Sequence, residues 1–242
     1  MDTVFVMEHL SDPDVVREQY RTEWRLETRR SVWRPAPDGS SPLDAAAAAV
    51  GTDVRGQILE VGCGTGEFAA RIAAEHPAAT VIATDRSERF VQLAGGRGLR
   101  ADLADVQDLP YTDHQFDVVL ALWMLYHVPD LDRGLQEVRR VLRPDGRFVA
   151  VTNGDAHLAD LLTEAGGAPL ITQFSSENGA AALARHFGEV RREEFATRAV
   201  FDDHAGAVGY LATMDETLAA NLPWFEGPRE YAGATTVFVA LP

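Results

Sequence analysis

Residues 58–68 read ILEVGCGTGEF, and this stretch decides the fold of the chain. An apolar run ends in the acid Glu60, three glycines follow at a spacing of two, and a helical pattern begins at Phe68. Glycines let the backbone turn sharply and let a ligand lie against it without a Cβ in the way. Exposed N–H groups at a helix start favour negative or polar ligand groups. The stretch predicts a buried strand, a tight turn and a helix whose N-terminus faces a ligand.

The spacing of the glycines and of the next acid indicates what that ligand contains. The pattern is E-x-G-x-G-x-G, and Glu67 stands where a dinucleotide fingerprint has its last glycine, so a carboxylate would lie beside a pyrophosphate. Residues 80–84 (TVIAT) predict a second buried strand, and Asp85 follows it. An acid there, roughly 20 residues after the glycine turn, is placed to accept hydrogen bonds from ribose hydroxyls. Together these features favour an adenosine-containing ligand without a pyrophosphate.

Four segments together resemble the class I S-adenosylmethionine-dependent methyltransferases. Residues 60–66 resemble the first motif of that family, and Asp85 matches the ribose-binding acid of the second. Residues 105–111 (DVQDLPY), followed by FDVV at 116–119, resemble its D-x-x-x-L-P-[FY]…F-D-x-V segment. Residues 135–147 resemble the helix and turn before the fifth strand, with Pro-Asp-Gly in place of the usual Pro-Gly-Gly, which a turn tolerates. The resemblance covers residues 57–152 firmly and says little about the methyl acceptor.

The resemblance implies S-adenosylmethionine as cofactor, S-adenosylhomocysteine as product, and no metal. It places Glu60 near the methionine end and Asp105 near the adenine amino group, with Asp102 as the rival for that role. Val106 would contribute its backbone N–H. The expected cofactor-binding residues are Glu60, Gly62, Cys63, Gly64, Gly66, Asp85, Arg86, Asp105, Val106, Ala121 and Leu122.

Composition narrows the class of protein. With 242 residues and 46% hydrophobic content the chain can bury one full α/β core. A net charge of −15 disfavours a nucleic-acid partner, since phosphate contacts need a basic surface. The chain has no lysine, which excludes a Schiff-base or P-loop lysine, and its single cysteine, Cys63, is expected to be a small packing residue in a reducing compartment. The chain has no apolar run of 18 residues and no basic N-terminal region, so we expect no membrane partner and a cytoplasmic location. Every basic residue of the Lys/Arg type is arginine, which hints at a bacterial genome and natural-product metabolism.

The hydrophobic pattern predicts a Rossmann-like doubly wound α/β fold. Strands are expected at 57–61, 80–84, 98–102, 116–122 and 147–152, with helices at 66–76, 87–95 and 131–142. Resemblance adds a seven-stranded, mostly parallel sheet with an antiparallel last strand (235–241) inserted between the fifth and sixth. Elsewhere we expect helices at 15–33, 42–51, 156–165, 179–186 and 204–219, and a strand at 190–201. We predict a single domain: N-terminal helices forming a lid (1–51), the cofactor-binding core (57–152) and substrate-side elements with the last strands (153–242).

Residues after the fourth and fifth strands are candidates for the acceptor side. His127 and His157 are the candidate general bases, since a histidine titrates near neutrality; packed or exposed loop histidines are the plain alternative. Tyr20 and Trp24, four residues apart, share a helix face that packs as a core stripe or covers the substrate. The candidate substrate residues are Tyr20, Trp24, Tyr126, Asn153 and Trp224.

No metal is expected, because Ala121 stands where metal-dependent relatives carry an acid and no ligand-spaced His/Cys cluster occurs. The function predicted is methyl transfer to an O, N or C atom of a small molecule. The alternatives are other chemistry on the same fold and cofactor site, a non-catalytic adenosyl-ligand-binding protein, and, more distantly, a nicotinamide-dependent dehydrogenase. The oligomeric state stays open between monomer and homodimer.

Overall fold

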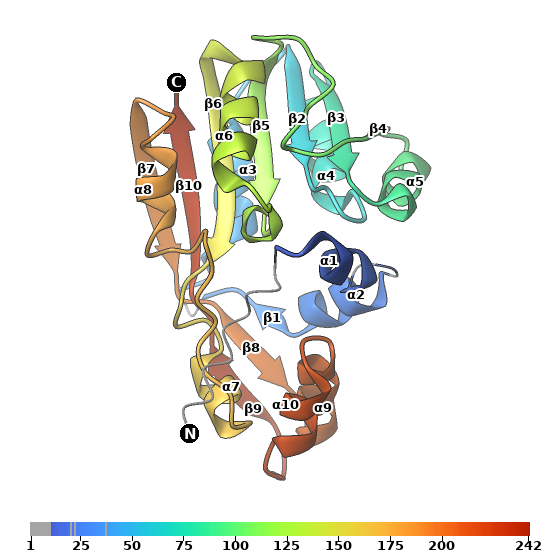
Figure 1. The fold of residues 1–242 in the computed structure, drawn as a ribbon, viewed down its shortest axis with the longest axis vertical. Coiled ribbons are helices and arrows are strands. Elements are labelled where there is room, and N and C mark those ends of the chain that lie inside the picture. Colours follow the sequence, from blue (N-terminus) through green and yellow to red (C-terminus); the bar gives the residue numbers. More distant parts are fainter. Residues whose placement is uncertain (1–10, 20, 22, 37) are drawn as a thin grey trace.

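The computed structural model describes residues 11–19, 21, 23–36 and 38–242. Its centre is a seven-stranded sheet (Figure 1). Its order is β4-β3-β2-β5-β6-β10-β7. Only β10 runs antiparallel to its neighbours β6 and β7, and the other pairs are parallel. This confirms the predicted fold class, including the antiparallel last strand between the fifth and sixth. The strands are β2 (Gln57–Val61), β3 (Thr80–Asp85), β4 (Arg100–Leu103), β5 (Phe116–Leu122), β6 (Leu142–Asn153), β7 (Glu189–Phe195) and β10 (Thr235–Leu241).

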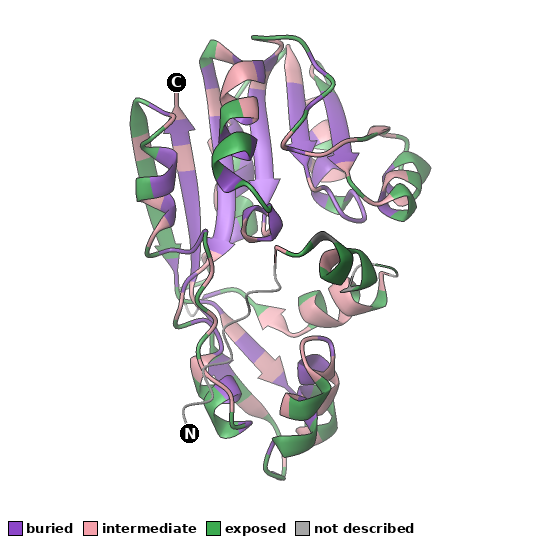
Figure 2. Ribbon diagram, in the orientation of Figure 1, coloured by how far each residue is buried: buried purple, intermediate pink, exposed green. Residues whose placement is uncertain are grey.

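Helices cover both faces of this sheet, so its central strands are buried on both sides (Figure 2). Successive side chains of a strand point to opposite faces, and β2 shows it: Leu59 and Val61 join one apolar cluster, whereas Ile58 joins the other. The first cluster contains α6 (Leu131–Val141) and α8 (Gly179–Leu183). The second contains α3 (Pro42–Val50), α4 (Glu67–Glu75) and α5 (Glu88–Gly96). Near-continuous apolar runs such as β5 are typical of such doubly covered strands.

A second, three-stranded antiparallel sheet lies below the first in Figure 1 and was not predicted. It consists of β1 (Trp33–Arg34), β8 (Arg198–Phe201) and β9 (Arg229–Ala232). The prediction of one strand over 190–201 was wrong, because the chain leaves the large sheet at Phe195 and enters the small one at Arg198. The sheet has its own apolar cluster with α7 (Ala159–Glu164), α9 (His204–Ala212) and α10 (Glu216–Asn221).

Two predicted helices are each divided in the structure. The helix expected over 204–219 is α9 and α10, because the Asp215 side chain accepts hydrogen bonds from the N–H groups of Thr217 and Leu218 and so begins a new helix. The helix expected over 15–33 is α1 (Pro13–Gln19) and α2 (Trp24–Ser31), followed by β1. The shorter helix expected after residue 41 is confirmed as α3, which begins at the Ser41 cap.

The helices α1 and α2 lie between the two sheets, beside the carboxyl ends of the parallel strands (Figure 1). No residue of α2 is buried. Polar bonds hold it instead: Arg30 donates to Glu67 at the start of α4, and Arg29 donates to Thr213 after α9. At its N-terminal end Glu23 pairs with Arg89 of α5. The predicted N-terminal cover is thus tied both to the cofactor-side helices and to the small-sheet segment.

Candidate active site

A cavity of about 1130 Å³ opens at the carboxyl edge of the parallel strands, under α1 and α2. Loops after β2, β3, β4 and β5 line one part of it, and the N-terminal helices and the small sheet line the rest. Pockets for one drug-sized ligand measure about 300–1,000 Å³. The cavity therefore has room for a cofactor and an acceptor side by side.

The glycine turn predicted from residues 58–68 forms the edge of this cavity. Gly62, Gly64 and Gly66 have φ values of 65°, 54° and 76°, a left-handed conformation that glycine adopts without strain. A Cβ on Gly64 would lie 3.1 Å from Leu26 of α2, across the cavity. A Cβ on Gly66 would lie 2.9 Å from the Cα of Ala94. Gly66 thus permits the close packing of α4 on α5, and its role as a ligand contact stays a prediction.

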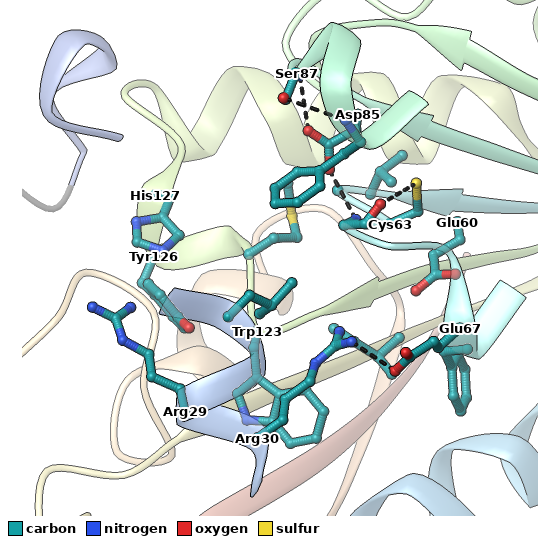
Figure 3. A pocket seen from close by; sticks show the side chains of 18 of the residues that line it. Arg29, Arg30, Glu60, Cys63, Glu67, Asp85, Ser87, Trp123, Tyr126 and His127 are labelled. Atoms are coloured by element: carbon teal, nitrogen blue, oxygen red, sulfur yellow. Dashed lines mark hydrogen bonds and ion pairs between the residues drawn. The ribbon is translucent and has the colours of Figure 1, made fainter. Parts of the chain in front are cut away.

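Asp85 holds the glycine turn and faces the same space (Figure 3). Its Oδ2 accepts the Gly64 N–H at 2.9 Å, and its Oδ1 accepts the Ser87 N–H at 2.9 Å. Burial raises the pKa of this carboxyl, opposed by these backbone hydrogen bonds. Each carboxylate oxygen can accept a further hydrogen bond. Asp85 is therefore positioned to receive two neighbouring hydroxyls, as the ribose hypothesis requires.

Glu60 is the most deeply buried acid in the cavity wall, with 2% of its surface exposed. Its Oε2 has no hydrogen-bond partner among the described residues. Burial raises its pKa to about 8, against the opposing charge of Arg30. A buried polar atom without a partner is costly. A cationic ligand group such as an ammonium would satisfy this oxygen, so the site fits the methionine end of S-adenosylmethionine.

The two acids proposed for the adenine contact lie in different surroundings. Asp105 lines the cavity with Val106, accepts the Gln107 N–H at 2.9 Å and pairs with Arg86 at 3.3 Å. Asp102 does not line it and instead accepts a hydrogen bond from the Tyr111 hydroxyl. The geometry favours Asp105, as predicted, and brings Arg86 beside it.

The end of β5 brings an unpredicted aromatic residue into the site. Ala121 is fully buried in the sheet core, so its contact with the cofactor stays a prediction, whereas Leu122 lines the cavity. Trp123 follows with a φ of 51°, which is rare for a bulky side chain. Its Nε1 donates to Asn153 Oδ1 at 2.8 Å. Strained backbone of this kind clusters at functional sites.

Of the two candidate bases, the structure favours His127. It lies edge-on to Tyr126, with 4.5 Å between ring centroids, and both residues line the cavity. His157 stacks on Trp33 at 4.4 Å, and its Nδ1 lies 3.1 Å from the Ala234 carbonyl oxygen. Burial lowers the pKa of His157 to about 4. A base this weak accepts a proton poorly near neutrality, so we assign His157 a packing role.

The predicted substrate residues separate into two groups. Tyr126 and Asn153 line the cavity. Trp24 and Trp224 are not among the lining residues, and 53% and 74% of their surfaces are exposed, so their role as substrate contacts stays a prediction. Tyr20 lies outside the described residues. Residues that sequence reasoning missed are Arg29, Arg30, Trp33, Trp123, Thr197 and Tyr210, all in the cavity wall.

Only the missed arginines had a signal in the sequence, which is the concentration of four arginines within residues 21–30 of an acidic chain. Trp33 and Thr197 come from β1 and from the residue before β8, and no local pattern connects them.

Cys63 lines the cavity, as its predicted place among the cofactor-binding residues requires. Burial raises the pKa of its thiol, which keeps it protonated and supports a packing role. No group of three or more His, Cys, Asp or Glu side chains that could hold a metal ion occurs in the part of the chain that the structure describes. Within the same residues, no helix is long and apolar enough to cross a membrane.

Comparison with known proteins matches the same part of the chain. Residues 59–150 match the family model described as a methyltransferase domain. The chain is 40% identical over 100 residues to a 27-O-demethylrifamycin SV methyltransferase of Amycolatopsis mediterranei. This match covers 38% of this chain and 36% of that protein. It is 37% identical over 98 residues to a demethylmenaquinone methyltransferase of Lactobacillus johnsonii, covering 37% of this chain and 40% of the relative. The matches thus span about two fifths of these relatives' length.

Solved structures extend the likeness beyond the matched segment at the level of the fold. The [4+2]-cyclase SpnF superposes with a TM-score of 0.59 at 20% identity, over 83% of this chain and 79% of that one. The glycine turn held by Asp85, the buried Glu60 and the family match all lie in the same segment of the sequence. Residues 59–150 therefore match a methyltransferase domain, in agreement with the resemblance of this segment to the class I S-adenosylmethionine-dependent methyltransferases.

Proposed function

We propose that this chain transfers the methyl group of S-adenosylmethionine to an O, N or C atom of a small-molecule acceptor. The proposal rests on one observation, which is that two acidic side chains with different environments line the same cavity. Asp85 is fixed by the Gly64 N–H, and the Oε2 of Glu60 lies buried without a partner among the described residues. These groups match the ribose and the cationic amino-acid end of one ligand.

The residues that would hold the cofactor come from consecutive loops. Gly62 and Gly64 line the cavity with their backbone, Asp85 would accept the ribose hydroxyls, and Asp105 with the Val106 N–H would contact adenine. When bound, S-adenosylmethionine supplies an electrophilic methyl on a sulfonium. Alignment of two reactants can lower a barrier by about 7–11 kcal/mol at the ideal limit. The chain's own contribution would therefore be mainly to position the acceptor and exclude water.

A general base is needed only where the acceptor must lose a proton. His127 is the candidate, because it lines the cavity next to Tyr126. The named relatives act on a demethylrifamycin and a demethylmenaquinone, which supports a small-molecule acceptor. A bacterial, cytoplasmic enzyme of natural-product metabolism remains our proposal, supported by the arginine-only composition and the rifamycin-named relative.

Calorimetric titration of S-adenosylhomocysteine into wild type, Asp85→Ala and Asp145→Ala tests the cofactor site. Asp145 is an exposed acid outside the cavity wall and serves as the matched control. We expect the Asp85 variant alone to bind roughly 100-fold more weakly, since it loses two hydrogen bonds to a charged group. Absence of binding to wild type would remove the proposal. Transfer from labelled S-adenosylmethionine to screened acceptors then tests the reaction.

The likeness to SpnF keeps one alternative in view. That protein is named as a [4+2]-cyclase, and at 20% identity the likeness concerns the fold alone. A fold can host several chemistries, because function lies in the site. This alternative would be favoured if the protein binds S-adenosylmethionine and converts an acceptor into a new product, but transfers no labelled methyl group to it. Binding with no acceptor change would favour a non-catalytic ligand-binding protein.

A further inference from the structure

Residues 233–235 carry the chain from the small sheet into β10, and three residues of the cavity wall contact this short segment. Thr197 contacts the first of them, since its carbonyl oxygen accepts that N–H at 2.7 Å. His157 contacts the second through Nδ1, which lies 3.1 Å from the carbonyl oxygen. Asn153 contacts the third, whose hydroxyl donates to its Oδ1 at 3.2 Å. Three consecutive residues thus bring Thr197, His157 and Asn153 together at one place in the cavity wall.

The Thr197 hydroxyl is buried at this place without a partner. A Cβ on Gly233 would collide with both Thr197 Oγ1 and the Trp33 ring, so the hydroxyl and the ring lie on the same side of Gly233. Only 7% of the Thr197 surface is exposed, and its Oγ1 has no hydrogen-bond partner among the described residues. A buried hydroxyl without a partner is costly, and a ligand in the cavity that Thr197 lines can supply one.

The Asn153 amide is held in one orientation. Trp123 Nε1 donates to Asn153 Oδ1 at 2.8 Å. An indole N–H can only donate, so the amide atom that faces it must be the oxygen. The Thr235 hydroxyl donates to the same oxygen. Because both partners occupy the oxygen, Asn153 can offer its two N–H donors to a ligand in the cavity that it lines.

Trp33 adds an apolar wall beside these polar groups. Its ring stacks on His157 with 4.4 Å between centroids and an interplanar angle of 28°, and both residues line the cavity. Burial lowers the pKa of His157 to about 4, so the imidazole is uncharged near neutral pH. The arginine next to Thr197, Arg198, pairs with Glu230 and is not a lining residue. No charge near neutral pH is therefore carried by the junction cluster, which consists of Trp33, Asn153, His157 and Thr197.

We propose that the junction cluster binds the methyl acceptor through an uncharged oxygen, a carbonyl or a hydroxyl, on a molecule with a flat apolar body. The inference rests on the proposed function, since it names the acceptor class for the same cavity. The Asn153 amide would donate to that oxygen, the Thr197 hydroxyl would gain its missing partner, and the Trp33 ring would cover the apolar body. A carboxylate buried at the same place would find no opposite charge within the cluster.

Ligand-observed NMR titrations on protein saturated with S-adenosylhomocysteine test this inference. Acetophenone supplies an uncharged carbonyl and benzyl alcohol an uncharged hydroxyl, ethylbenzene has a similar shape without oxygen, and benzoate carries a negative charge. We expect wild type to bind acetophenone or benzyl alcohol more tightly than ethylbenzene and benzoate. The tighter of the two oxygen-bearing probes identifies the kind of oxygen that the cluster prefers.

Asn153→Asp is the decisive variant, because its carboxylate still accepts from Trp123 and Thr235 but has no N–H to donate. We expect it to weaken the tighter oxygen-bearing probe about tenfold or more, since the ligand oxygen then faces another acceptor. The control is Asn221→Asp, the same change at an exposed position outside the cavity wall, which should leave that affinity unchanged. Thr197→Val should weaken the probe about 3- to 10-fold without lowering the midpoint of urea unfolding, because the hydroxyl it removes has no partner among the described residues.

Four results would overturn the inference. They are equal affinity of wild type for ethylbenzene and both oxygen-bearing probes, tighter binding of benzoate than of either, no binding of any oxygen-bearing probe, and an unchanged probe affinity in Asn153→Asp. Should Asn153→Asp not fold, Thr197→Val decides by the same criterion. Retained S-adenosylhomocysteine binding by wild type in those cases would leave the proposed function standing, whereas its absence would remove the proposed function itself.

Discussion

Replacing Glu60 by glutamine is expected to make the ligand-free protein more stable and its cofactor binding weaker. The carboxyl is buried, its Oε2 has no partner among the described residues, and its pKa is raised to about 8. An unfolded glutamate titrates near 4.3 to 4.5. At a pH between these two pKa values, the Glu60 carboxyl is ionised in the unfolded chain and protonated in the folded chain. The folded state therefore binds more protons than the unfolded state in this range. The free energy of unfolding is highest below this pH range and falls as the pH rises through it.

The size of the effect follows from the pKa difference. Each unit corresponds to about 1.4 kcal/mol, so the loss is about 1 kcal/mol at pH 5 and about 3 kcal/mol at pH 7. Glutamine keeps the shape and carries no charge in either state. For a chain of this length 1 kcal/mol moves the melting temperature by about 2–4 °C. We therefore expect Glu60→Gln to melt roughly 6–12 °C higher than wild type at pH 7, and within a few degrees of it at pH 5.

Two measurements on the same variant check this reasoning. Urea denaturation at pH 5 and at pH 7 gives the stability difference, with Glu75→Gln on the outer face of α4 as the control. Calorimetry with S-adenosylhomocysteine gives the binding difference, which should be roughly tenfold or more for a lost charge-assisted contact. A variant that is less stable than wild type at pH 7, or whose stability gain is equal at both pH values, would refute the argument from burial.

Three further changes test other parts of the site. Gly66→Ala should destabilise the fold by about 2–4 kcal/mol in urea denaturation, because it adds left-handed strain and a 2.9 Å approach to the Ala94 Cα; an unchanged midpoint would contradict this. Burial lowers the pKa of His157 to about 4, so the free energy of unfolding of wild type should fall by up to about 3 kcal/mol as the pH falls from 6.5 toward 4. His157→Gln should lack this pH-dependent loss, and parallel curves of stability against pH for the two proteins would argue against the assignment. His127→Ala should lower turnover about 10²- to 10⁴-fold at saturating acceptor if His127 is the base, and near-unchanged turnover would end that hypothesis.

The cofactor half of the site could be predicted because its residues are close in sequence. Glu60 and Gly64 lie on one strand-turn-helix, and Asp85 ends the next strand, so strand periodicity alone brings them to one sheet edge. Two details within the motifs still required coordinates. Gly66 packs against α5, and Ala121 points into the core. Both follow from which side of a turn or strand a side chain takes, a question that the spacing of the motif leaves open.

The acceptor half could not be predicted in the same way, because its residues meet only through tertiary contacts. Trp33 pairs with Ala199 in a two-residue strand, and Thr197 stands just before β8. A strand that short has no periodicity to detect. The sequence pattern at 190–201 gave no sign that the chain changes sheets near Phe195. Trp24 was selected for its helix face and Trp224 as an aromatic residue in a loop, and neither feature reports whether the side chain points toward the cavity.

Three departures from local folding rules meet in this one cavity. Glu60 is an acid buried with an unpartnered oxygen, Trp123 holds a left-handed backbone, and Thr197 is a buried hydroxyl that also lacks a partner among the described residues. Natural proteins break local folding rules chiefly at functional sites. Glu60 marks the end of the cavity suited to a cation, and Trp123 stands at the end of β5 with its side chain held by Asn153. We therefore expect the positively charged methyl donor to bind with its amino-acid end at Glu60 and the acceptor to lie toward Trp123 and Thr197.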